Sequence, residues 1–181
     1  MSTTAWCSGL LLGVMAMTAH VTPVVADPIL ISRVRGVDGR AAALLDEAQW
    51  RSSTFQQLVA QLSASDLIVY VSRTVLDGTL RGALRFVGSG ADGGRFLLVE
   101  LNDALGNGLD APSDRLAGIA TLAHELHHAL EVADSDQVQD SESFEAFYAE
   151  AGNRSSPDVV DTEAAQLAGE QVYFEMTGRK Q

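Results

Sequence analysis

Three of the four histidines in the chain stand within five consecutive residues, His124-Glu125-Leu126-His127-His128. The residues around them are apolar at helical spacing, which predicts a helix from Ser113, its N-cap, to about Val132. On such a helix His124 and His128 are four residues apart, so both imidazoles lie on one face. This pair constrains the fold, because a metal ion that it binds needs another ligand from a segment packed against the same helix.

The spacing of His124, Glu125 and His128 is the HExxH pattern of zinc-binding helices. Glu125 is too close in sequence to His124 to bind the same ion comfortably, but it can reach a zinc-bound water and act as its general base. We expect Zn2+ as the cofactor, since two imidazoles and one carboxylate, with a fourth position left to water, suit this ion. His127 is expected to pack or to support a ligand.

The third ligand must be an acid, because no other histidine follows residue 26 and the single cysteine lies in the first ten residues. Asp161 is the first candidate, since on a last helix it would share a face with small residues and be buried. Glu163 and then Glu145 follow as alternatives. Asp134 is a further one, at the last position of the HExxHxxGxxH pattern, although Glu131 there replaces the glycine that makes the turn.

The first 26 residues contain no charged side chain and include an apolar run from Leu10 to Met17. Small residues ending at Ala26 are typical of a cleavage site, so we expect residues 1–26 to be a signal peptide. The apolar run is shorter than the roughly 20 residues that cross a bilayer. We therefore expect an exported protein, periplasmic or secreted, with no membrane span after cleavage.

Residues 27–181 are expected to form a single α+β domain, because helices and strands occur in separate runs. The expected strands are 29–37, 67–71, 83–87 and 95–101, the last two joined by a glycine-rich hairpin loop. The expected helices are 40–50, 52–62, 113–132, 141–151 and 157–177, the last beginning at Ser156-Pro157-Asp158 and ending at Gly178.

Acidic residues outnumber basic residues by 24 to 12, which gives a net charge of −12. A surface of this sign repels phosphate backbones, so we expect no nucleic-acid partner. The charge favours solubility, and we expect a monomer.

The segment Thr121–Ala133 resembles the active-site helix of the zincin metallopeptidases. It is also similar to a group of small exported bacterial proteins that carry an AHELxHAxE helix and a later helix beginning with Glu-Thr, which Asp161–Val172 matches here. The resemblance implies a gluzincin-like site, with two histidines from one helix and an acid from a later one. Asp161 replaces the glutamate of that group and is one methylene shorter. Either the helices come closer here, Glu163 takes over, or the site is weaker.

The resemblance further implies a zincin-like fold, with a small, twisted, mostly antiparallel sheet packed on the histidine helix. It also implies an exposed edge strand along which an extended peptide binds, and Phe96–Leu101 is the expected edge. Tyr148 and Tyr173 are candidates for stabilising an oxyanion. The expected function is that of a zinc metalloendopeptidase, with a peptide or protein as substrate. The alternatives are a catalytically inactive zincin-fold module that binds zinc or a partner in the cell envelope, and a zinc hydrolase of an amide outside proteins.

Overall fold

The computed structural model describes residues 32–151, 153–156 and 159–178. The expected signal peptide, residues 1–26, and the start of the expected first strand lie outside the described residues. The described residues belong to one compact unit. Within these ranges, none of the helices combines the length and the apolar character that crossing a membrane requires.

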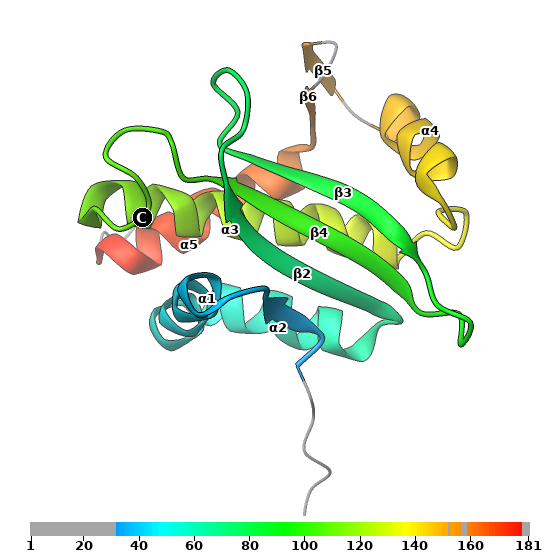
Figure 1. Ribbon diagram of the computed structural model, residues 1–181, viewed down its shortest axis with the longest axis horizontal. Helices are drawn as coiled ribbons and strands as arrows, with labels where there is room; N and C mark the ends of the chain where they lie inside the picture. The colour runs from blue at the N-terminus through cyan, green and yellow to red at the C-terminus, as the bar shows by residue number, and fades with distance from the viewer. Residues whose placement is uncertain (1–31, 152, 157–158, 179–181) are drawn as a thin grey trace, which may run out of the picture. The chain divides into compact units, whose positions relative to one another are not determined.

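The described elements make an α+β fold, as the sequence predicts (Figure 1). In chain order they are β1 (Val34–Gly36), α1 (Gly39–Arg51), α2 (Ser53–Ala64), β2 (Leu67–Thr74), β3 (Gly82–Ser89), β4 (Arg95–Asn102), α3 (Pro112–Ala133), α4 (Ser141–Ala151), β5 (Asn153–Ser156), β6 (Val159–Asp161) and α5 (Glu163–Thr177). The first four strands form a sheet in the order β1-β2-β4-β3, and β5 pairs with β6.

The expectation of a mostly antiparallel sheet is wrong. β1 pairs with β2 and β2 with β4 in parallel, while β3 alone runs antiparallel to β4. The reason lies in α1 and α2, which return the chain to the same end of the sheet before β2 begins and so allow a parallel pair. The expected edge at Phe96–Leu101 is also wrong, because these residues belong to the central strand β4. The edge strand next to β4 is β3.

The core lies between this sheet and the helices. Alternate residues of the two central strands are completely buried, namely Leu67, Val69 and Val71 on β2 and Leu97, Val99 and Leu101 on β4. α2 buries the four apolar residues that the sequence predicts, Phe55, Leu58, Val59 and Leu62. α3 packs against β3, β4 and α2 and lies alongside α5 (Figure 1). The histidine helix is therefore enclosed by the sheet on one side and by α5 on another.

Two helix starts differ from the sequence-based expectation. α3 begins at Pro112 after Ala111, and Ser113 is not its N-cap, since proline with its fixed φ suits the first helical position. The last helix begins at Glu163 and not at residue 157, because the β-branched pair before Asp161 is in strand β6. The side chain of Thr162 caps this helix by accepting a hydrogen bond from the amide of Ala165.

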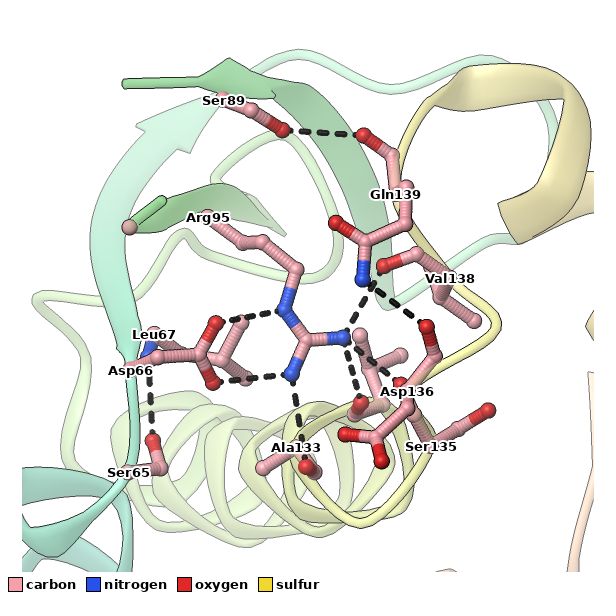
Figure 2. Close-up of polar contacts among 12 residues, drawn as sticks. Ser65, Asp66, Leu67, Ser89, Arg95, Ala133, Ser135, Asp136, Val138 and Gln139 are labelled. Atoms are coloured by element: carbon pink, nitrogen blue, oxygen red, sulfur yellow. Dashed lines mark hydrogen bonds and ion pairs between the residues drawn. The ribbon is translucent and has the colours of Figure 1, made fainter. Parts of the chain in front are cut away.

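The C-terminal end of α3 is fixed to the sheet by Arg95, the first residue of β4 (Figure 2). Its guanidinium is 3% exposed and forms two hydrogen bonds to Asp66, of 2.7 and 2.8 Å. It also donates to four backbone carbonyls at and just beyond the helix end, those of Val132, Ala133, Ser135 and Val138. The last carbonyls of a helix have no partner within it, so Arg95 satisfies them and holds the histidine helix in place.

Candidate metal centre

His124 and His128 lie one turn apart on α3, as the sequence predicts. Their Nε2 atoms are 3.1 Å apart, and the two rings meet edge to face. Burial lowers the pKa of His124, and the neighbouring His128 lowers it further. This favours a neutral imidazole, which is the form that binds metals.

Asp161 is the acid that the fold brings to this pair. Its Oδ1 lies 3.6 Å from His124 Nε2. Among the described residues, His124, His128 and Asp161 form the group of ligand-type side chains whose donor atoms all lie within 4.8 Å of one another. These three residues are the candidate metal centre.

The two oxygens of Asp161 have different surroundings. Oδ2 accepts a hydrogen bond of 2.6 Å from the side-chain amide of Gln166. Oδ1 is buried and has no hydrogen-bond donor within the described part of the chain. A buried carboxylate oxygen without a partner is unfavourable, and a cation between the imidazoles would provide one.

The other candidate acids are not part of this group. Glu163, Glu145 and Asp134 are all exposed, and Asp134 follows the end of α3, which continues straight through Glu131. On α4 the side chain of Tyr148 is buried, whereas that of Glu145 is exposed.

The expectation that Asp161 lies on the last helix is wrong. This residue lies on strand β6, two positions before α5, and not on a helical face with alanines.

α5 lies close to α3 at Gly169. Gly169 of α5 faces the backbone of α3, where a Cβ on it would lie 2.9 Å from the carbonyl oxygen of Ala120 and 3.4 Å from His124 Cβ. A larger residue here would push the helices apart. Glu163, the alternative ligand, is exposed and is not part of the group that Asp161 forms with the histidines.

The spacing of the three donor atoms suits a zinc-sized ion. Zinc bonds to nitrogen and oxygen are about 2.0–2.2 Å long, so two ligand atoms in a tetrahedral site are roughly 3.3 Å apart. The observed separations are 3.1 Å between the two Nε2 atoms and 3.6 Å between His124 Nε2 and Asp161 Oδ1. The third separation, between His128 and Asp161, is within 4.8 Å. The residues therefore fit such an ion in donor type, and the two separations at His124 Nε2 are close to the expected distance.

Glu125 lies beside this group and is 7% exposed. Burial raises the pKa of Glu125 to about 7. Gly82 of β3 makes room for it, since a Cβ on Gly82 would lie 2.8 Å from Glu125 Oε1 and 2.7 Å from Thr121 Cγ2. The structure thus places the expected base between the histidine helix and the edge strand.

Glu131 is a residue of this region that the sequence-based reasoning did not identify as part of the site. Its Oε2 is 2.7 Å from His128 Nδ1, and its Oε1 accepts a hydrogen bond of 2.6 Å from the hydroxyl of Thr162. Burial raises the pKa of Glu131, but the hydrogen bonds from His128 and Thr162 outweigh it and the pKa falls below its usual value. The sequence held a signal, because Glu131 is three residues after His128 and so shares its helical face.

The remaining candidates have other roles. His127 is half-buried outside the candidate metal centre, with its Nε2 3.9 Å from Glu131 Oε1. The Tyr148 hydroxyl donates to the backbone carbonyl of His128 at 2.8 Å, and its ring packs against that histidine. Burial raises the pKa of Tyr148. Tyr173 is 37% exposed on α5. Tyr148 therefore supports the position of His128 through packing and one hydrogen bond.

Comparison with known proteins finds no matching family model, no matching curated protein and no matching solved structure. The fold and the site define an α+β domain with a candidate metal centre of two imidazoles and one carboxylate.

Proposed function

We propose that this protein is a zinc-dependent metallopeptidase of the gluzincin-like type. The observation that carries the proposal is the buried Asp161 Oδ1, which has no hydrogen-bond donor among the described residues and faces two imidazoles. A purely structural acid would be expected to have its oxygens bonded. The buried Glu125 beside this group adds the base that hydrolysis needs.

His124 and His128 would hold the ion through Nε2, and Asp161 would hold it through Oδ1. When bound, a zinc ion lowers the pKa of a water molecule and polarises the carbonyl of a peptide bond. Glu125 accepts the proton of the attacking water and returns it to the leaving amine. Burial raises the pKa of Glu125 above its usual value, which makes this carboxylate a stronger proton acceptor.

The substrate in this proposal is an extended peptide that binds along β3. Within the described residues β3 pairs with β4 alone, so its other side has free backbone groups for an added strand. The Gly82 end of β3 lies against Glu125, whereas Ser89 at the other end donates a hydrogen bond to the carbonyl of Gln139. The open part of the edge is therefore next to the proposed base.

The uncharged N-terminal segment of residues 1–26 supports export as part of this proposal, to the periplasm or the exterior.

The direct test measures bound zinc and cleavage of a mixed peptide library for the wild type and for Glu125→Gln. We expect one zinc per chain in both proteins and a loss of cleavage of about 10²–10⁴-fold in the variant, because only the proton acceptor is removed. Glu145→Gln, which changes an exposed acid, is the matched control and should cleave like the wild type. Cleavage that survives Glu125→Gln would overturn the mechanism. Bound zinc without cleavage in the wild type would favour a zinc-binding module instead.

A further inference from the structure

The Glu131 carboxylate contacts both segments that carry the candidate ligands. It lies on α3, three residues after His128, and one of its oxygens is 2.7 Å from His128 Nδ1. The other oxygen accepts a hydrogen bond from Thr162, the residue directly after Asp161. The proposed reaction gives Glu131 no chemical step, so its two contacts need a different explanation.

The contact with His128 fixes which ring nitrogen is free. An ionised carboxylate can only accept a hydrogen bond, so Nδ1 must be the protonated nitrogen. The lone pair of the neutral ring is then on Nε2, which points toward His124 and the candidate metal centre. A carboxylate on the far nitrogen also makes an imidazole a stronger ligand.

The contact with Thr162 fixes the position of the acid. The Thr162 hydroxyl donates to Glu131 and at the same time accepts from the amide of Ala165, which caps α5. Thr162 is therefore held from both sides, and Asp161 is one residue before it on β6. Through this hydroxyl, Glu131 ties the strand that carries Asp161 to the helix that carries the histidines.

We propose that Glu131 is a positioning residue that prearranges His128 and Asp161 for metal binding through its two hydrogen bonds. This inference rests on the metal centre of the proposed function but not on peptide cleavage. The proposal gives a role to Glu131, which stands where the HExxHxxGxxH pattern has a glycine.

The test is the zinc affinity of the metal-free protein, measured by calorimetric titration with zinc alone. We expect Glu131→Leu to weaken zinc binding by about 10–100-fold, the usual effect of removing a residue that supports a metal ligand. Glu131→Gln should retain most of the affinity, since its oxygen can accept from His128 and its amide can donate to Thr162. Glu145→Leu, an exposed acid on α4, is the matched control and should bind like the wild type.

A second pair of variants tests the link to Asp161. Thr162→Val should weaken zinc binding, whereas Thr162→Ser, which keeps the hydroxyl, should not. The losses from Glu131→Leu and Thr162→Val should be less than additive in the double variant, because both remove the same contact. The absorption spectrum of the cobalt-substituted protein should also differ between Glu131→Leu and the wild type, since the ligands are held less firmly.

The outcomes separate the inference from the proposed function. If Glu131→Leu remains folded and binds zinc as tightly as the wild type, the inference is overturned. If the wild type binds zinc and shows these differences but cleaves no peptide, the inference holds and the peptidase proposal fails.

Discussion

A carboxylate lies near each end of α5. Glu175 is in the helix and Asp161 is on β6 just before it, and the two differ in how their oxygens are hydrogen-bonded. Near the C-terminal end, both oxygens of Glu175 accept hydrogen bonds, including those from the hydroxyls of Ser52 at 2.6 Å and Thr54 at 2.7 Å. The amide of Thr54 adds a third at 3.2 Å. Just before the N-terminal end, Asp161 has one oxygen bonded to Gln166 and the other without a donor among the described residues.

This difference in hydrogen bonding indicates different roles for Glu175 and Asp161. Glu175 lies at the N-terminus of α2, where free amides and the helix dipole favour a negative charge. Burial raises its pKa, but the hydrogen bonds from Ser52 and Thr54 outweigh this and lower the pKa of Glu175 to about 2. Glu175 thus joins α5 to α2. Asp161 is not compensated in this way, which is the arrangement expected of an acid that binds a ligand.

The largest expected effect is on stabilisation by zinc. With zinc at about 100 to 1,000 times the dissociation constant, the free energy of unfolding of the wild type should rise by about 2.7–4.1 kcal/mol. Asp161→Asn should lose this gain at the same zinc concentration, whereas Glu175→Gln should keep it. Urea unfolding with and without zinc measures both. Equal gains in the two variants would remove the distinction between the two acids.

The next effect concerns the protein without metal, where the order is reversed. Glu175→Gln should lower the free energy of unfolding by about 1–3 kcal/mol, because charged hydrogen bonds are lost and donors are left unpaired. Asp161→Asn should not lower it, since the variant replaces a buried charge that has an unbonded oxygen. Urea unfolding in the presence of a chelator checks this. A large destabilisation by Asp161→Asn would mean that Asp161 is structural.

The pH dependence sharpens the comparison further. Since the pKa of Glu175 is about 2 in the folded protein and ordinarily 4.5, its contribution to stability is complete above about pH 4.5. It is then lost as the pH falls from 4.5 toward 2. The difference in unfolding free energy between the wild type and Glu175→Gln should therefore shrink over this range and stay constant between pH 5 and pH 7. A difference that grows toward low pH would contradict this assignment.

The smallest expected effect is at Gln166, which orients Asp161 through a single exposed hydrogen bond. Gln166→Ala should weaken zinc binding by less than about tenfold, since one such bond contributes about 1 kcal/mol. Calorimetric titration with zinc measures the change, and Gln171→Ala, near Glu175, is the control at the other end of the helix. A loss at Gln166 as large as that at Asp161 would contradict this ranking and show that orientation matters as much as the ligand itself.

The sequence predicted those parts of the fold and site that depend on local spacing. The apolar stripe of α2, the helical pair His124 and His128, and the stop at Gly178 all follow from helical periodicity and backbone preference. The parallel order of β1, β2 and β4 did not follow, because pairing between distant strands leaves no local pattern.

Non-local contacts also explain what the sequence does not predict about the site. Asp161 lies on strand β6 and not on the predicted helical face, and its distance to the histidines depends on how β6 and α3 pack. The role of Glu131 depends on Thr162, 31 residues later in the chain. Such contacts are set by packing of the whole domain.

The central claim is that His124, His128 and Asp161 together bind a zinc ion. Its most direct test is equilibrium dialysis of the metal-free protein at a fixed free zinc concentration, followed by elemental analysis of the zinc bound per chain. We predict one zinc per chain for the wild type and for Glu163→Gln, and far less than one for Asp161→Asn and for His128→Ala. A wild type that binds no zinc, or an Asp161→Asn variant that binds as much as the wild type, would contradict the account.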